Sequence, residues 1–253
     1  MPTDVLKHAP AVLRSNLPWI LFLGAVALQG AAMRIVVHRA RITSSMPPLV
    51  EPDIVASESI SAPMEELPGL PVMTEPIVGA HVPTDPSRLP GAVRGYRGGV
   101  HEGVDFSCAP GEPVVAAADG WVLSIDDEPN LPEPRRNELL SVCRELGETP
   151  PEVLRVLHGR RITLRHESSD GHLLTSSYSH LASIREDLRP GAHVFRGEQV
   201  GTAGSSGTSH AYRHDGWGEV HFEVRIDGHP LGLGGPPRQA RALYCKCLGE
   251  EVR

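Results

Sequence analysis

The most regular pattern of apolar and polar positions in the chain lies at residues 219–226, which read Glu-Val-His-Phe-Glu-Val-Arg-Ile. The apolar residues alternate strictly with the polar ones, which is typical of a β-strand with one face on a hydrophobic core. Side chains two residues apart on a strand point to the same side. His221 therefore shares the polar face of this strand with the carboxylates of Glu219 and Glu223.

Shorter segments of the same kind precede this strand, and turn residues such as Pro-Gly, Arg-Gly and Asp-Gly separate them. Many short strands with regular turn signals predict an all-β fold, a small antiparallel barrel or sandwich. The expected strands lie within residues 111–122, 161–166, 173–180 and 199–204.

The pattern changes to a helical one between residues 127 and 158. Leucine, valine and cysteine residues in 136–146 recur at helical spacing, and Gly147 follows as a stop. Thr149 is followed by two prolines and Glu152, which resembles the start of a second helix with Thr149 as its N-cap. We predict a helical hairpin inserted between two strands, either as a lid over a site or as a packing decoration.

The N-terminal part of the chain carries an apolar run at residues 17–33, with Lys7 and Arg14 before it. Its length is close to the lower limit of about 17 residues for a membrane-spanning helix. Residues 1–42 are therefore interpreted as an export signal or a membrane anchor, and a buried core helix is the structural alternative. An exported protein of the periplasm or cell envelope, either free or tethered to the inner membrane, is expected.

The segment 43–90 is dominated by Pro, Ser, Glu and Val, and no sustained helical or strand period runs through it. This composition is typical of an extended Pro-rich linker. The sequence thus predicts a folded domain over residues 91–240 and a C-terminal tail over residues 241–253.

Charge and cysteine content narrow the function classes. The net charge of the 253-residue chain is -7 and Lys and Arg form no long block, which argues against a nucleic-acid partner. The four cysteines include no CxxC pair, and whether any of them form disulfides in an exported protein stays open.

A second polar stretch, His-Glu-Gly-Val-Asp at residues 101–105, offers another imidazole and another carboxylate. Together with the polar face of residues 219–226, it supplies enough nitrogen and anionic oxygen ligands to bind a zinc ion.

Four sequence blocks occur in an order that resembles the lysostaphin-type (LytM-like) zinc endopeptidases. The resemblance runs from Gly95 to Asp227, about half of the chain. One block alone is a weak signal, but four in order, separated by expected strands, are specific. The blocks are Gly95-Tyr96-Arg97 with His101 and Asp105, Gly111-x-Pro113-Val114 with Ala118-Asp119-Gly120, Tyr178-Ser179-His180-Leu181, and Val220-His221-Phe222-Glu223.

This resemblance implies a β barrel or sandwich of the duplicated-hybrid-motif type and a zinc cofactor. The implied metal ligands are His101, Asp105 and His221, and the implied catalytic histidine is His180. The chain departs from the family at Glu219, which stands where the family has the first histidine of a His-x-His motif.

Three interpretations of Glu219 remain open. As a general base, its carboxylate takes a proton from the water that zinc activates. As a fourth metal ligand, it closes the shell and makes the site inert. In the third interpretation the domain has lost catalysis. The loop histidines His210 and His214 either supply the missing imidazole or are solvated, and the remaining ones, among them His158, are interpreted as ordinary.

The resemblance implies a zinc-dependent endopeptidase that hydrolyses peptide bonds in bacterial cell-wall peptidoglycan. In that mechanism Glu219 accepts a proton, and His180 either stabilises the developing oxyanion or donates a proton to the leaving amine. The alternative is an impaired peptidase-like domain that binds the cell wall or regulates a partner hydrolase. A third, more distant alternative is the related barrel of sugar-transport phosphocarrier domains, against which the export signal argues.

Overall fold

The computed structural model describes residues 69–127 and 130–251. The apolar run at 17–33 and the greater part of the expected linker, residues 43–68, lie outside the described residues. Within the described ranges, no helix has the length and apolar character needed to cross a membrane.

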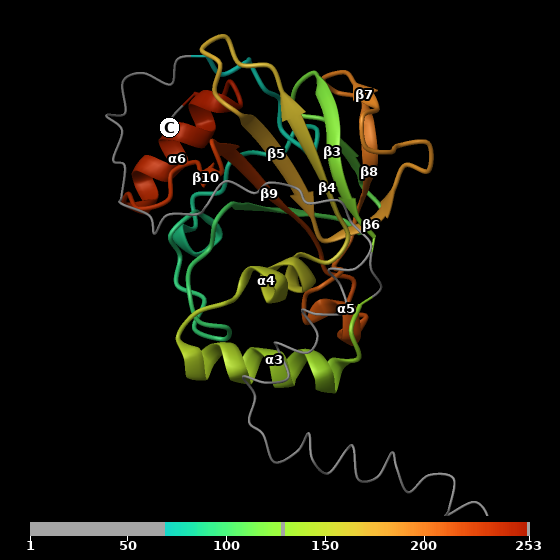
Figure 1. The fold of residues 1–253 in the computed structure, drawn as a ribbon, viewed down its shortest axis with the longest axis vertical. Coiled ribbons are helices and arrows are strands. Elements are labelled where there is room, and N and C mark those ends of the chain that lie inside the picture. Colours follow the sequence, from blue (N-terminus) through green and yellow to red (C-terminus); the bar gives the residue numbers. More distant parts are fainter. Residues whose placement is uncertain (1–68, 128–129, 252–253) are drawn as a thin grey trace, which may run out of the picture. The chain divides into compact units, whose positions relative to one another are not determined.

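The described chain is built mainly of short strands, with shorter and longer helices between them and one helix near the end (Figure 1). The strands are β1 (Val104–Cys108), β2 (Pro113–Val115), β3 (Gly120–Asp126), β4 (Arg161–His166), β5 (Leu174–Ser179), β6 (Leu181–Ile184), β7 (His193–Val194), β8 (Gln199–Ala203), β9 (Gly218–Ile226) and β10 (His229–Pro230). The helices are η2 (Pro86–Arg88), α3 (Glu133–Leu146), α4 (Pro151–His158), α5 (His210–Arg213) and α6 (Pro237–Cys247).

The strands form two antiparallel sheets. The larger sheet has the order β1-β9-β5-β4-β3-β7, with β10 added beside β9, and the smaller has the order β2-β8-β6. Side chains of both sheets enter one hydrophobic core, for example Val114 of β2, Val200 of β8 and Phe222 of β9. The prediction of a mainly antiparallel β fold is confirmed, with a few helices added to it. The larger sheet stays open between its edge strands β1 and β7, so the described strands form no closed barrel.

Strand β9 is buried on both of its faces, although its sequence predicts only one buried face. Val220, Phe222 and Val224 lie in the core. On the opposite face His221 is 4% exposed and Glu223 is 1% exposed. The polar face therefore faces a covered site and not open solvent.

The described part of the expected linker belongs to the folded domain. Met73, Ile77, Val82 and Leu89 are buried in the core, and the Thr74 backbone N–H donates to the Ala117 carbonyl at 2.8 Å. This segment runs as irregular chain, so its buried residues show no regular period. The hydrophobic pattern of the sequence therefore gives no indication that this segment is folded.

The expected C-terminal tail is also part of the domain, because α6 packs on the core. Tyr244, Cys245, Cys247 and Leu248 are buried. The hydroxyl of Tyr244 accepts a hydrogen bond from the backbone N–H of Val224 in β9 at 3.2 Å. All four cysteines of the chain are free thiols, so none of them forms a disulfide in this structure.

The predicted helical hairpin is present as α3 and α4, inserted between β3 and β4. The expected N-cap is wrong in detail. Helix α4 is preceded by Pro150, without a side-chain cap, and the Thr149 hydroxyl lies 2.8 Å from the Arg97 carbonyl oxygen and 2.6 Å from that of Gly98. Thr149 thus ties the hairpin to the loop before β1.

The packing of α6 generates a stability prediction. We expect Tyr244→Ala to lower the free energy of unfolding by about 3–5 kcal/mol, as for other large buried aromatic residues, and Tyr244→Phe to lower it by about 1 kcal/mol through loss of one hydrogen bond. Urea unfolding followed by circular dichroism measures both. The matched control is Phe195→Ala, whose side chain is 63% exposed and for which we expect a change of about 0.5 kcal/mol or less. Equal effects of Tyr244→Ala and Phe195→Ala would contradict the packed helix.

Candidate metal centre

Strand register brings the candidate ligands together. In the β1–β9 pair Asp105 lies opposite His221, and in the β5–β9 pair Ser179 lies opposite the same histidine. His180 follows Ser179 directly, and His101 precedes β1 by three residues. Residues far apart in the sequence therefore meet around the middle of β9.

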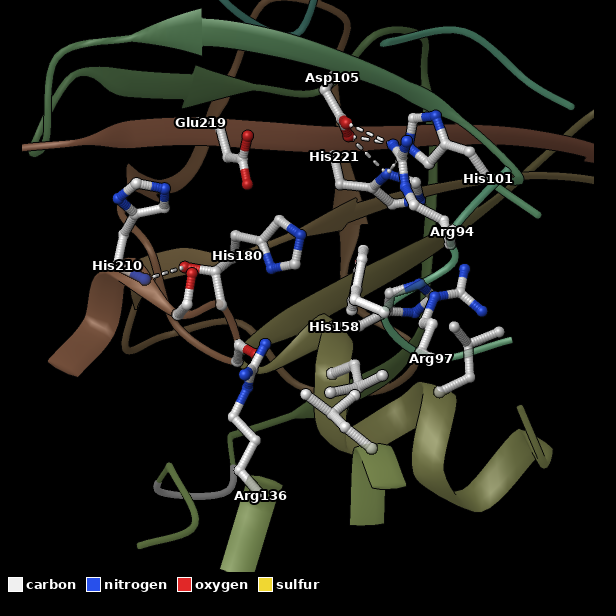
Figure 2. Close-up of a pocket in the computed structure, with 17 residues that line it drawn as sticks. Arg94, Arg97, His101, Asp105, Arg136, His158, His180, His210, Glu219 and His221 are labelled. Carbon is white, nitrogen blue, oxygen red and sulfur yellow. Dashed lines mark hydrogen bonds and ion pairs between the residues drawn. The ribbon is translucent and has the colours of Figure 1, made fainter. Parts of the chain in front are cut away.

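Three potential ligand atoms converge at this point (Figure 2). His101 Nε2 lies 2.9 Å from Asp105 Oδ1 and 2.8 Å from His221 Nδ1. His221 Nδ1 lies 2.8 Å from the same Asp105 oxygen. The structure thus brings together the three residues predicted as metal ligands.

The second nitrogen of each imidazole is anchored by an acceptor. His101 Nδ1 lies 3.1 Å from the carbonyl oxygen of Leu89, and His221 Nε2 lies 2.9 Å from Glu223 Oε1. A carbonyl or carboxylate oxygen only accepts, so these nitrogens carry the hydrogens. Such partners fix the orientation of metal-binding histidines in general.

These anchors leave His101 Nε2 and His221 Nδ1 to face each other at 2.8 Å. Two unprotonated nitrogens at this distance repel unless a proton or a metal cation lies between them. Burial lowers the pKa of His101 to about 4, so its imidazole is neutral. Burial also opposes the charged form of His221, but hydrogen bonds to Asp105 and Glu223 outweigh it and raise its pKa to about 9. The space between the ligand atoms is thus electrostatically suited to a cation.

Two nitrogens and one carboxylate oxygen fit a zinc ion with one coordination position left open, as in catalytic zinc sites. Zinc–ligand bonds of about 2.0–2.2 Å correspond to ligand atoms roughly 3.3 Å apart in a tetrahedron, so the observed separations need only a small expansion. The other oxygen of Asp105 is held by Arg94 Nη2 at 3.0 Å. This ion pair directs Oδ1 toward the two histidines.

Gly103 allows the loop carrying the first two ligands to approach β9. A Cβ atom at this position would lie 2.5 Å from the Phe222 carbonyl oxygen and 2.9 Å from Cε1 of His221. Only glycine fits this contact without displacing the backbone. The spacing His101-x-Gly103-x-Asp105 therefore has a steric reason.

His180 is held in an unusual conformation at the turn between β5 and β6. Its φ of 65° lies in the left-handed region, which residues with a side chain rarely adopt. Its Nδ1 lies 2.8 Å from the carbonyl oxygen of Ser206 and so carries the hydrogen. Burial lowers the pKa of His180, with Glu219 opposing. The neutral ring therefore has its acceptor nitrogen, Nε2, available.

Glu219 lies on the same face of β9 as His221 but outside the group of converging ligand atoms. It lines the same pocket as His180, and Figure 2 shows its carboxylate directed to that pocket. In this geometry the carboxylate is placed as a polar group of the pocket and not as a fourth member of the ligand group.

His158, interpreted from the sequence as an ordinary histidine, lies in the site. Its ring stacks on His221 with centroids 5.0 Å apart, and its Nε2 is 3.5 Å from Glu223 Oε1. The carbonyl of His158 also accepts the backbone N–H of His180 at 2.9 Å. His158 ends α4 just before Gly159, and no local pattern connects this position with β9. Only the docking of the insertion reveals its role.

Of the two loop histidines, His210 lines the pocket. Its Nδ1 lies 2.8 Å from Asp215 Oδ2, and its ring stacks on Trp217 with centroids 5.0 Å apart. His214 is not among the pocket-lining residues. The structure therefore places one imidazole, oriented by a carboxylate, on the same pocket as Glu219.

The pocket has a volume of about 320 Å³. The candidate ligands, His180, Glu219 and the loop 207–210 line it, and the inserted helices contribute a wall of their own. The insertion is thus part of the site, which agrees with its interpretation as a lid over a site and not with that as a packing decoration. The residues that it contributes are Arg136, Leu140, Leu154, Leu157 and His158.

Comparisons with known proteins give the following likenesses. No protein-family model matches the chain. Uncharacterised proteins of Mycobacterium tuberculosis (Rv3786c) and Mycobacterium bovis (Mb3815c) are each 32% identical to it over 156 residues, which cover 60% of this chain and 28% of theirs. The chain thus matches little more than a quarter of the length of these curated relatives.

Among solved structures, a zinc-containing peptidase from Vibrio cholerae is 20% identical with a TM-score of 0.41, covering 64% of this chain and 39% of that one. The catalytic domain of lysostaphin from Staphylococcus simulans is 21% identical with a TM-score of 0.34, covering 55% of this chain and 74% of that one. The catalytic domain of a prophage-encoded M23 protein from Enterococcus faecalis is 24% identical with a TM-score of 0.36, covering 65% and 89%.

The anchoring of His221 generates a prediction about metal affinity. We expect Glu223→Gln to weaken zinc binding about 10- to 100-fold, because partners that orient metal-binding histidines have effects of this size. Competition with a chromophoric chelator measures the zinc dissociation constant. Glu219→Gln is the matched control on the same strand face, and we expect it to change the affinity by no more than about twofold, since Glu219 lies outside the ligand group. An equal loss in both variants would instead identify Glu219 as a fourth ligand.

Proposed function

We propose that this chain is a zinc-dependent endopeptidase that hydrolyses peptide bonds in bacterial cell-wall peptidoglycan. The observation that carries the proposal is the convergence of His101, Asp105 and His221 on one point at the edge of a pocket. His180 and Glu219 line the same pocket and supply the two proton-transfer groups that hydrolysis of a peptide bond needs.

In this mechanism His101, Asp105 and His221 would hold the metal. Zinc, when bound, supplies a Lewis acid that polarises the scissile carbonyl and makes water a stronger nucleophile. Glu219 accepts the proton that the attacking water loses. Nε2 of His180 receives this proton and donates it to the leaving amine. The Nδ1–H group of the same ring keeps its hydrogen bond to the Ser206 carbonyl oxygen. The proton thus moves from water to the amine through two side chains of this chain.

A second base is available to the same reaction. His210 is oriented by Asp215 in the way that a carboxylate orients a catalytic imidazole, and it lines the pocket. We infer that His210 is the general base, in place of the family's histidine at position 219, if Glu219 proves dispensable. The two assignments differ in which substitution removes activity.

The alternative function is a peptidase-like domain without catalysis that binds the cell wall or regulates a partner hydrolase. The carboxylate at position 219, where the resembled family has an imidazole, favours this alternative. The intact set of three ligands and His180 favours the enzyme.

The proposed location is outside the cytoplasm, in the periplasm or cell envelope. The apolar run at residues 17–33 supports an export signal or an inner-membrane tether, and the Pro-rich segment after it supports a spacer. The net charge of -7 supports peptide rather than nucleic-acid partners.

The proposal predicts that the zinc-loaded protein releases peptides from intact peptidoglycan, read by mass spectrometry of new termini. We expect Asp105→Ala to abolish release, and Glu219→Gln and His180→Ala each to lower it by about 10²–10⁴, the usual contribution of a positioned proton-transfer group. We expect His210→Ala to lower it by less than about tenfold.

The outcomes separate the assignments. If Glu219→Gln keeps full activity and His210→Ala loses it, the histidine is the base. If the folded, zinc-loaded chain releases no peptides from peptidoglycan of several compositions, the enzyme assignment fails and the regulatory alternative remains.

A further inference from the structure

Three arginines line the pocket beside the candidate metal centre, and two of them are deeply buried. Arg97 is 6% exposed and Arg136 is 8% exposed. Arg94 forms an ion pair with Asp105. Among the described residues, no carboxylate lies within ion-pairing distance of Arg97 or Arg136.

Arg136 is held from one side only. Its Nε donates to the carbonyl of Gly207 at 3.1 Å, and no other hydrogen bond from this guanidinium reaches a residue of the described chain. Figure 2 shows the guanidinium rising from α3 toward His180 and the loop that carries His210. The remaining N–H groups of Arg136 are therefore the free donors of this pocket wall.

Arg97 forms a fixed background charge. Its Nη1 donates to the Thr149 hydroxyl at 2.9 Å and its Nη2 to the Val100 carbonyl at 2.7 Å. The bond to Thr149 joins the loop before β1 to the segment that leads into α4, and the bond to Val100 lies within that loop. The two guanidiniums thus belong to different segments that the insertion holds around one pocket.

A buried guanidinium without an anion is costly, so such groups are normally paired. Leu140, Leu154 and Leu157 line the pocket beside Arg136 and lower the local dielectric, which strengthens any charge pairing there. Arginine presents a planar fork of donors that matches the two oxygens of a carboxylate. A peptide substrate brings such a group at its C-terminus or on an acidic side chain.

We propose that Arg136, supported by Arg97, forms a subsite for a carboxylate of the peptide substrate, so that the pocket selects peptides with a free carboxylate near the bond to be cut. This inference rests on the proposed function for its substrate class. It assigns the helical insertion a role in specificity, because Arg136 lies on α3.

Binding of short peptides to the metal-free full chain tests the subsite without requiring cleavage. The probes are trialanine as the free acid, trialanine amide, and Ala-Glu-Ala amide, measured by isothermal titration calorimetry. We expect the wild type to bind trialanine acid at least about tenfold more tightly than trialanine amide, as expected for a charge-assisted hydrogen bond. Tighter binding of Ala-Glu-Ala amide than of trialanine acid identifies a side-chain carboxylate as the preferred source.

We expect Arg136→Gln to remove this preference. The matched control is Arg135→Gln, the neighbouring residue on α3, whose side chain is 52% exposed and pairs with Glu138. The control should keep the preference of the wild type. The inference is overturned if Arg136→Gln also keeps the preference for the acid. It is likewise overturned if the preference arises only after zinc is added and is equal in the wild type and Arg136→Gln, because the carboxylate then binds the metal.

A second variant covers the case in which Arg136→Gln does not fold. Leu140 is four residues from Arg136 on the same helix and lines the same pocket, so Leu140→Glu supplies an internal carboxylate to Arg136. We expect it to abolish the preference for the acid, while Leu140→Gln retains it. Retention in Leu140→Glu would contradict the subsite. A preserved preference in a chain that cleaves no peptidoglycan would leave the subsite standing and count only against the enzyme.

Discussion

The contact of two imidazole nitrogens with one carboxylate oxygen, all within 2.9 Å of one another, is the constraint on which the rest of the site depends. Such a group persists only if the other polar atom of each side chain is held by a partner. Leu89 orients His101, Glu223 orients His221, and Arg94 orients Asp105. These partners come from an irregular segment, from β9 itself and from the loop before β1. The three antiparallel strands β1, β9 and β5 set the register, and the irregular chain around them supplies the anchoring groups.

The sequence predicts those parts of the site that lie on regular elements. The alternation in β9 predicts that Glu219, His221 and Glu223 share one face, and in the structure Glu223 Oε1 lies 2.9 Å from His221 Nε2 on that face. The helical spacing of the insertion is likewise confirmed. Leu89 and Met73 escape prediction because irregular chain has no period. His158 and Arg136 escape because their place in the site arises from tertiary docking of the insertion, which local patterns do not encode.

The insertion changes the electrostatics of the site as well as its shape. By covering the polar face of β9, it buries His221 and Glu223 and brings His158 and Arg136 into the pocket. Charges in such an environment interact more strongly than in water, and an unpaired one is correspondingly costly. The pairs Glu223–Arg225 and Asp105–Arg94, at 2.7 and 3.0 Å, offset this cost for the two carboxylates. Arg97 and Arg136 have no such partner among the described residues, so the excess charge of the pocket is positive.

This excess offers a physical reason for a carboxylate at position 219. An imidazole there is neutral near neutral pH and leaves the positive charge of the pocket unchanged, whereas Glu219 adds a negative charge opposite the arginines. A bound metal dication would increase the positive charge further. The same positive charge stabilises a substrate carboxylate at Arg136, which lies on the opposite wall in Figure 2. Glu219 in β9 and Arg136 in α3 are thereby two parts of one charge balance across the pocket that the insertion completes.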